Sequence, residues 1–338
     1  MGVICYIRVF EGVVRPGDEI KMMNTDKVFE VNQVGYTSRG RIATKELRSG
    51  DVGFIEASIK QVKDARVGDT ITTVENPTDK PLTGYKEVLP MVYSGIYPAE
   101  GESFDKLRDS LEKLQVNDAA LVFEQENSQA LGVGLRAGFL GLLHMDIITQ
   151  RLEREYDLDI IATAPSVIYK LKLKGQDNEK ELQNPNDFPD PTEIQYIKEP
   201  VTISEIITPK DYIGQVMDLA QSRRGELINM TYIDESRVSI KYKIPLSEVI
   251  YNFFDSLKSR TRGYASLDYE VTDYQVSDLV KLDILINEQN VDALSLIVHR
   301  DNAYSRGRGI VEKLKDEIPR QQFAVPIQAA IGGKIIAR

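Results

Sequence analysis

Two stretches of this 338-residue chain repeat one order of expected elements, and that order restricts the fold more than any other feature. Each reads strand, helix, strand, strand, helix, strand, because alternating apolar residues predict strands and apolar residues three to four apart predict helices. The first stretch comprises strands at residues 88–97, 119–125, 130–136 and 159–163, a helix carrying Phe104, Leu107, Leu111 and Leu114 on one face, and a helix from Phe139 onward. A chain with this order is expected to form an α+β domain.

The second stretch repeats the order downstream. Its expected elements are strands at residues 201–208, 226–233, 237–244 and 264–272, with helices at 210–224 and around 249–257. Thr208 suits an N-cap, Pro209 the first helical position and Gly225 the C-terminal stop. Both stretches match the βαββαβ pattern of ferredoxin-like domains, which we expect at residues 83–168 and 201–277.

Three further segments complete the expected organisation. Residues 1–82 carry short alternating strands between Gly-containing turns, which predicts a small β-barrel that is incomplete because its first strand is missing. Residues 169–200 are rich in Pro, Asn and Asp and are expected to form a connector without core elements. Residues 278–338 offer two strands and a helix, so we expect a C-terminal α+β module, and the whole chain is predicted to be multidomain α+β.

A glycine pattern raises the possibility of an oxidoreductase. Gly132-x-Gly134-x-x-Ala137 has the spacing of a dinucleotide-binding turn, and Asp157 follows about twenty positions later, as that fingerprint asks. The glycines, however, alternate with Leu131, Val133 and Leu135, which predicts that they lie inside a strand and permit close approach of a neighbouring backbone. An NAD-dependent oxidoreductase is therefore retained as an unfavoured alternative.

Composition restricts the class of protein further. The net charge is −10, yet from Arg300 onward eight Lys and Arg residues face four Asp and Glu residues, which indicates a basic end. The single Cys5 excludes an internal disulfide framework and fits a reducing cytosol. The longest apolar run, near residues 139–143, is far shorter than a membrane-spanning helix.

The sequence offers little machinery for catalysis. Its two histidines, His144 and His299, are far apart, and His144 lies in an expected helix, where a half-buried or capping role is the simpler interpretation. One Cys and two separated His do not make a zinc or Cys-His site. Gly333-Lys334 is followed by Ile335, so no nucleotide-binding Gly-Lys-Ser/Thr loop is present. We expect no catalytic centre, metal or cofactor in this chain.

Basic residues gather at the expected ends of elements, and an RNA surface is one interpretation of them. They are Arg223, Arg224, Lys258, Arg260 and Arg262 with Tyr264, and further along Arg300, Arg306, Arg308, Lys313 and Lys315. The members near helix C-termini also stabilise the helix dipole, which needs no ligand. Arg306-Gly-Arg308-Gly is expected in a loop before a helix, where the dipole disfavours positive charge and phosphate contact becomes the better explanation.

Several longer motifs resemble translation factors. Residues 141–148 resemble a Gly-x-x-His-x-x-Ile-Ile stretch in the third domain of elongation factor G, and residues 208–209, 222–225, 244–248 and 259–263 resemble its fifth domain. The first 80 residues look like its barrel. Residues 262–269, 299–302 and 318–323 look like runs specific to the LepA-type translational GTPases, and the short connector stands where elongation factor G carries a whole domain.

The resemblance implies a function that the residues alone do not give. The chain would be the ribosome- and tRNA-binding body of a GTPase that promotes back-translocation of tRNAs and fidelity of protein synthesis. GTP and Mg²⁺ would be bound by an N-terminal GTPase domain that we expect to be missing, as is a basic C-terminal tail. A monomer is expected, cytoplasmic and ribosome-associated, with a peripheral place on the membrane also implied. Another elongation factor G-like ribosomal factor is the alternative.

By the same resemblance, the predicted RNA contacts divide into two groups. Arg223, Arg224, Lys258, Arg260, Arg262 and Tyr264 would face ribosomal RNA. Arg300, Arg306, Arg308, Lys313 and Lys315 would meet tRNA.

Overall fold

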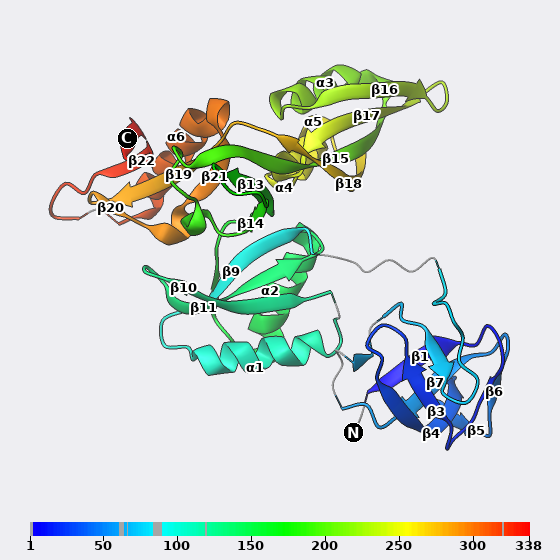
Figure 1. Cartoon of the computed structure of the whole chain (residues 1–338). Helices are drawn as coiled ribbons and strands as arrows, with labels where there is room; N and C mark the ends of the chain where they lie inside the picture. Colours follow the sequence, from blue (N-terminus) through cyan, green and yellow to red (C-terminus); the bar gives the residue numbers. More distant parts are fainter. Residues whose placement is uncertain (1–2, 61–63, 66, 84–89, 119, 320) are drawn as a thin grey trace. The chain divides into compact units, whose positions relative to one another are not determined.

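The computed structural model describes residues 3–60, 64–65, 67–83, 90–118, 120–319 and 321–338. It divides into two compact units, one of residues 1–89 with 112–120 and the other of residues 90–111 with 121–338. Each unit is described by itself, and Figure 1 labels the elements along the chain. The starts of the strands expected at 88 and 119 lie outside the described residues.

The first unit is built from short antiparallel strands. One sheet has the order β1-β7-β4-β3-β8, with β5 added to β4, and β2 pairs with β6. The strands are β1 (Ile4–Arg8), β2 (Val13–Val14), β3 (Glu19–Met22), β4 (Val28–Thr37), β5 (Arg41–Thr44), β6 (Leu47–Arg48), β7 (Val52–Ala57) and β8 (Ile71–Thr73). Alternation places residues such as Ile20, Val34 and Ile55 in a common core.

The first of the repeated stretches lies in the second unit except for residues 112–120, which include the end of α1. Its elements are β9 (Val92–Pro98), α1 (Phe104–Gln115), β10 (Val122–Ser128), β11 (Gly132–Phe139), α2 (Leu142–Tyr156) and β12 (Ile160–Ala162). The sheet is antiparallel with the order β10-β11-β9-β12. The helix expected from Phe139 begins at Leu142 instead, because Phe139 still pairs with Val92 in the ladder.

The glycine pattern lies in this sheet. Gly134 is in β11 opposite Glu126, and a Cβ added there would lie 2.7 Å from the carbonyl oxygen of Ile96. Asp157 is the left-handed C-cap of α2, with φ 50°. The glycine therefore serves close strand packing, and the strand-turn-helix context of a dinucleotide site does not form around it.

The expectation of a connector at residues 169–200 is wrong. The segment contains β13 (Tyr169–Leu173), β14 (Lys180–Leu182), the 3₁₀ helix η2 (Pro185–Asp187) and the start of β15 (Ile194–Pro209). Tyr169, Leu171, Leu182 and Ile197 are buried in one apolar cluster. The Pro and Asn residues mark the turns between short strands, and the alternation of Tyr169 and Leu171 is the signal that their composition obscured.

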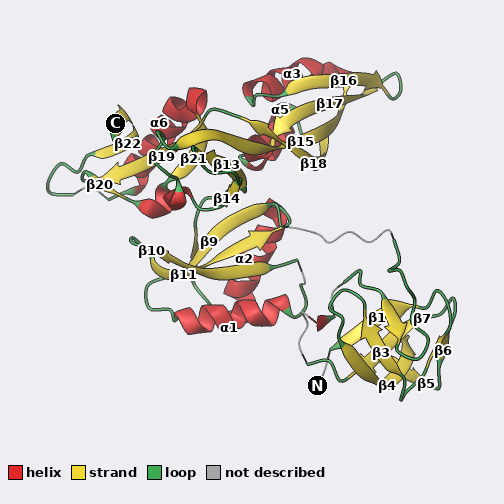
Figure 2. Cartoon of the chain, viewed as in Figure 1, coloured by secondary structure: helices red, strands yellow, loops and turns green. Residues whose placement is uncertain are grey.

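The second repeated stretch starts on the long strand β15. It continues through the 3₁₀ helix η3 (Lys210–Tyr212), α3 (Ile213–Ser222), β16 (Glu226–Tyr232), β17 (Arg237–Pro245), α4 (Leu246–Ile250), α5 (Phe253–Arg260) and β18 (Ser266–Val276). The sheet order is β14-β13-β15-β17-β16, with β18 also on β15. Figure 2 shows the strands and helices of this part in separate colours.

Two details of these helices differ from expectation. Thr208 is not the N-cap, because it lies in β15 and its buried hydroxyl has no hydrogen-bond partner in the described part of the chain. Pro209 ends β15 and takes the N-cap position of η3, so it is not the first helical residue. The helix expected around residues 249–257 is two helices, since Asn252 takes a left-handed conformation with φ 55° between them.

The C-terminal part forms a further sheet with one long helix. Its elements are β19 (Leu279–Ile286), β20 (Gln289–Asn290), the 3₁₀ helix η4 (Asp292–Leu294), β21 (Leu296–His299), α6 (Arg300–Glu317), β22 (Ile327–Ile331) and β23 (Lys334–Ala337). The order is β20-β19-β22-β23, with β21 on β19. The chain is thus multidomain α+β with antiparallel sheets, while the predicted domain boundaries stay predictions.

The expectation of a loop at Arg306-Gly-Arg308-Gly is wrong, because these residues lie inside α6. Ala303, Gly307 and Val311 are buried at helical spacing. A Cβ on Gly307 would lie 2.8 Å from the Cβ of Ala329 on β22. The glycine therefore allows α6 to lie close against the sheet, and it does not interrupt the helix.

Candidate RNA-binding surface

Two buried carboxylates hold three of the arginines that the sequence places at an RNA surface. Glu199 on β15 is fully buried and Glu248 on α4 is 4% exposed. Arg224 donates to both oxygens of Glu199 at 2.7 and 2.9 Å, and its Nε donates to Glu248 at 3.2 Å. Arg306 donates to Glu248 at 3.1 Å, and Nη1 of Arg223 lies 3.7 Å from the same carboxylate oxygen. We call these five residues the arginine cluster.

The local backbone explains why the arginines point inward. Arg223 caps the C-terminus of α3, and Arg224 follows with φ 59°, so the turn directs both side chains toward α4. Burial and then the nearby charge of Arg306 lower the pKa of Arg223. Burial is the largest single influence on Arg224 and lowers its pKa, but the hydrogen bonds and charges of Glu199 and Glu248 together outweigh it and raise the pKa of Arg224.

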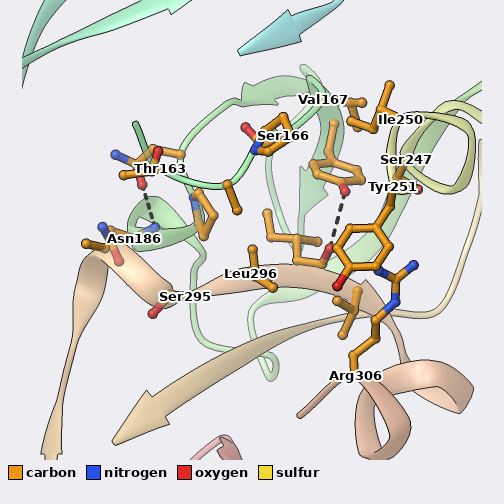
Figure 3. A pocket seen from close by; sticks show the side chains of 18 of the residues that line it. Thr163, Ser166, Val167, Asn186, Ser247, Ile250, Tyr251, Ser295, Leu296 and Arg306 are labelled. Atoms are coloured by element: carbon orange, nitrogen blue, oxygen red, sulfur yellow. Dashed lines mark hydrogen bonds between the residues drawn. The ribbon is translucent and has the colours of Figure 1, made fainter. Parts of the chain in front are cut away.

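The cluster also ties α6 to the second repeated stretch. Asn302 donates to Glu248 at 3.0 Å, next to the bond from Arg306. The guanidinium carbon of Arg306 lies 3.3 Å from the ring centroid of Tyr251, a contact visible in Figure 3. Both residues of α6 therefore bind the same carboxylate, and Glu248 joins the C-terminal part to residues 194–277.

The expectation that these arginines are exposed is wrong. The side chains of Arg223, Arg224 and Arg306 are 19%, 20% and 15% exposed. A buried carboxylate must be paired, and arginine offers the donors that pair it. Their predicted role toward RNA is untested by this geometry, but the structure gives them a role in holding the fold.

The remaining predicted tRNA contacts lie along α6. Arg300 is the first residue of the helix and pairs with Asp278 at 2.6 and 3.1 Å. Arg308 pairs with Glu312 at 2.8 Å, one turn further along the helix. Lys313 and Lys315 are exposed near the end of the helix, where a positive charge favours the dipole. Arg306 and Arg308 lie inside α6 and not before its start, so the helix dipole gives no reason for a phosphate contact there.

Most of the predicted ribosomal contacts at the α5–β18 turn are more exposed than the arginines of the arginine cluster. Arg260, Arg262 and Tyr264 are exposed, and Tyr264 is 68% exposed. Lys258 is half-buried and donates to the carbonyl oxygen of Gly263 at 3.2 Å. The structure brings these four residues together on one turn, and we call them the turn surface.

A cavity of about 80 Å³ lies beside the arginine cluster. Figure 3 shows its lining, which includes Ser166, Leu296 and Arg306. Within it the carboxylate of Glu126 accepts hydrogen bonds from Tyr97 at 2.9 Å and from Asn184 at 3.0 Å. Burial, and then the bond to Glu126, raise the pKa of Tyr97.

A second carboxylate of the cavity lining holds a turn. Asp292 accepts hydrogen bonds from the Ser128 hydroxyl at 2.9 Å and from the backbone N–H groups of Gln129, Ala130 and Ala293. Burial opposes ionisation, but these bonds outweigh it and lower the pKa of Asp292. The polar groups here bind one another, which indicates a structural junction.

The histidines have local structural contacts. Nδ1 of His144 accepts a hydrogen bond from the Leu140 N–H at 3.0 Å, and its ring packs edge-on against Phe139. The expectation that His144 is half-buried is confirmed, and its bond is to the residue before the N-cap Gly141. His299 similarly accepts from the Asp301 N–H at 3.3 Å and caps α6.

In the part of the chain that the structure describes, no three His, Cys, Asp or Glu side chains are grouped so as to hold a metal ion. Across those same residues, no helix has the length and apolarity needed to cross a membrane.

Known proteins match the chain along its whole length. Elongation factor 4 of Finegoldia magna is 66% identical over 337 residues, which cover 100% of this chain and 56% of the relative. The chain belongs to the elongation factor 4 (LepA) family. Elongation factor 4 of Clostridioides difficile is 61% identical and that of Acetivibrio thermocellus 59% identical, each with the same coverage. The chain spans about half the length of the curated relatives it matches.

Three family descriptions match successive parts of this elongation factor 4 family member. "Elongation factor Tu domain 2" matches residues 2–72, "Elongation factor G C-terminus" residues 196–285 and "GTP-binding protein LepA C-terminus" residues 286–338. Residues 196–285, which match the second description, include the turn surface and both glutamates of the arginine cluster. The residues that match the third contain the whole of α6, so the cluster joins the two matched regions.

Several residues of this elongation factor 4 family member that contact the predicted RNA-binding residues are not predicted from the sequence. They are Glu199, Glu248, Tyr212 and Asn302, each of which contacts a predicted residue. A signal existed for Glu199, which falls on the same face as Ile197 and Val201 when the strand is read with a two-residue alternation. A charge at such a position predicts a buried partner.

Proposed function

We propose that the chain is the ribosome- and tRNA-binding body of a translational GTPase that promotes back-translocation of tRNAs and the fidelity of protein synthesis. The observation that carries this is identity of 59–66% to elongation factor 4 proteins over 100% of the chain. The intact protein would use GTP and Mg²⁺, bound by the part of the relatives that this chain does not span. It would act as a monomer in the cytoplasm, associated with ribosomes.

The finer fold assignment belongs to the same proposal. Residues 4–73 would be the translation-factor barrel, which the match to "Elongation factor Tu domain 2" supports. The two repeated stretches would be ferredoxin-like domains. Their sheets share one order, β10-β11-β9-β12 and β16-β17-β15-β18, in which the first strand of the repeat lies between the third and the fourth.

The turn surface is the part of the predicted ribosomal contact that the structure supports. Two of its cations, Arg260 and Arg262, are exposed, so they can reach the phosphates of folded RNA. Arg308, Lys313 and Lys315 on α6 remain the proposed tRNA contacts, with Arg300 beside them. Arg223, Arg224 and Arg306 would act mainly by holding α6 in place.

Toeprinting tests the proposed activity. A longer form, carrying the part present in the relatives, is added with GTP to ribosomes in the post-translocation state. The toeprint is expected to shift backward by one codon, and the shift should require GTP. An unchanged toeprint with ribosome-stimulated GTP hydrolysis would favour the alternative, another elongation factor G-like factor.

Ribosome sedimentation tests the proposed binding directly. The longer form should sediment with ribosomes at low salt and dissociate as salt rises, since phosphate contacts release counterions. Failure to sediment at any salt concentration would contradict the proposed function.

A further inference from the structure

The turn surface and the neighbouring Phe254 combine two exposed aromatic rings with the exposed cations of Arg260 and Arg262. Tyr264 is 68% exposed, and Phe254 on the preceding helix is 49% exposed. The ammonium of Lys258 lies 5.4 Å from the Phe254 ring centroid. Arg260 and Arg262 are exposed and have no ion-pair partner within the described residues. In contrast, the arginines of the arginine cluster are bound to glutamates.

The backbone holds Tyr264 in a fixed place. The N–H of Gly263 donates to the carbonyl of Lys258 at 2.8 Å, and that of Tyr264 donates to Thr261 at 3.0 Å. The buried Thr261 hydroxyl donates to Leu257 at 2.7 Å and accepts from the N–H of Ala265 at 3.1 Å. The turn is thus bonded to the helix before it and to the residue that precedes β18.

A second ring supports Tyr264 from one side. The ring of Tyr212, at the end of η3, stacks on it with centroids 6.1 Å apart and planes inclined by 22°. Tyr212 is half-buried, while Tyr264 remains largely exposed. Solvent therefore reaches the Tyr264 ring away from Tyr212, and that ring face is open to a flat ligand.

We propose that Tyr264, backed by Tyr212, stacks on an unpaired base of a folded RNA, with Arg260 and Arg262 on the flanking phosphates. The inference rests on the proposed function and names the kind of RNA feature that this surface takes. Contact with a duplex backbone needs only cations, whereas an unpaired base stacks on aromatic rings. A rigid, supported ring loses little conformational entropy when a base stacks on it.

The charge of the surface favours RNA over a protein partner. Residues 258–264 hold three cations and no acidic residue, in a chain whose net charge is −10. Such a local reversal attracts a polyanion and repels a basic protein surface. A protein partner is left as an outcome of the test below.

The test compares three labelled RNA hairpins at low salt. One has a single unpaired purine bulge, the second has the same bulge without its base, and the third is fully paired. The chain is used as the wild type and as Tyr264→Leu, Tyr264→Phe and Tyr212→Leu. Tyr6→Leu is the matched control, because Tyr6 is also 68% exposed but lies on β1 of the other compact unit.

The wild type should bind the purine bulge at least about fivefold more tightly than the baseless bulge, the lower end of the effect of one stacked base. Tyr264→Leu should remove this preference, Tyr264→Phe should keep it, and Tyr212→Leu should reduce it. Tyr6→Leu should behave as the wild type. Competition with large ribosomal subunits or with free tRNA then identifies which RNA supplies the base.

Three results would overturn the inference. They are equal binding of the two bulges, a preference that survives Tyr264→Leu, and absence of any hairpin binding at low salt. Ribosome sedimentation of the longer form separates this failure from failure of the proposed function. If Tyr264→Leu weakens ribosome sedimentation while hairpin binding is unchanged, the surface docks on protein and the base-stacking inference is wrong.

Discussion

Removing the carboxylate of Glu248 tests whether the arginine cluster holds the fold. Glu248 is 4% exposed and accepts hydrogen bonds from Arg224, Arg306 and Asn302, while Arg223 lies 3.7 Å away. In Glu248→Ala, Arg306 and Arg223 would keep no carboxylate within the described contacts, whereas Arg224 would keep Glu199. The variant therefore leaves positive charge in a partly buried site without compensation.

The expected cost follows from these contacts. Removing one partner of a buried ion pair costs about 3–5 kcal/mol, and the 15–20% exposure of the guanidinium side chains places this case near 3 kcal/mol. Glu248→Gln keeps one acceptor oxygen and nearly the same volume, so we expect about 1.5–3 kcal/mol, the range of a hydrogen bond to a charged group.

Urea unfolding with hydrogen exchange measures the effect. Because the chain has two compact units, exchange is followed in peptides of β15, α4 and α6 instead of relying on one global transition. Glu312→Ala is the control, since Glu312 and Arg308 form a pair in which both side chains are 59% exposed, and it should change stability by no more than about 0.5 kcal/mol. If Glu248→Ala has the same urea midpoint and the same hydrogen-exchange rates as the Glu312→Ala control, the structural role assigned to the cluster is wrong.

Three further predictions concern other parts of the chain. Gly134→Ala should lower the free energy of unfolding by about 1–3 kcal/mol, because its Cβ has no room against the neighbouring strand. Gly214→Ala in α3 meets open space and should raise the free energy of unfolding by about 0.5–1 kcal/mol. The melting temperatures of the two variants should therefore shift in opposite directions. The lowered pKa of Asp292 means that its ionised form stabilises the fold above the ordinary value of 3.8 and that this contribution is lost as pH falls through the lower folded pKa. Asp292→Asn should therefore be less stable near neutrality and lose less stability than the wild type on acidification below about pH 4, as pH-dependent urea midpoints would show. Arg308→Glu combined with Lys315→Glu should reduce the slope of log affinity for tRNA against log salt by about 0.7–0.9 for each lost contact, and an unchanged slope would remove them from the tRNA surface.

Local patterns in the sequence predicted much of the element order. The alternation around Gly134 placed it in a strand, and the close approach to Ile96 gives the physical reason. The same local rules failed at Gly307, because two glycines between arginines indicate a loop, whereas these residues lie inside α6. Its spacing from Ala303 and Val311 was the stronger signal, because small buried residues let a helix lie close to a sheet.

The arginine cluster could not be predicted from local patterns. Arg224 and Glu199 are 25 residues apart and Arg306 and Glu248 are 58 apart, so their pairing depends on the packing of whole elements. An arginine that ends a helix has the same local sequence whether it faces RNA or a buried glutamate. At the turn surface Arg260, Arg262 and Tyr264 are exposed, as an RNA contact requires, because Arg262 lies in a tight turn between a helix and a strand.

A cryo-EM map of the longer form bound to the ribosome tests the account most directly. The account predicts Lys258, Arg260, Arg262 and Tyr264 against ribosomal RNA, Glu248 still bound to Arg306 inside the protein, and the exposed side of α6 toward tRNA. A map in which the turn surface faces solvent, or in which Arg306 leaves Glu248 to contact RNA, would contradict it.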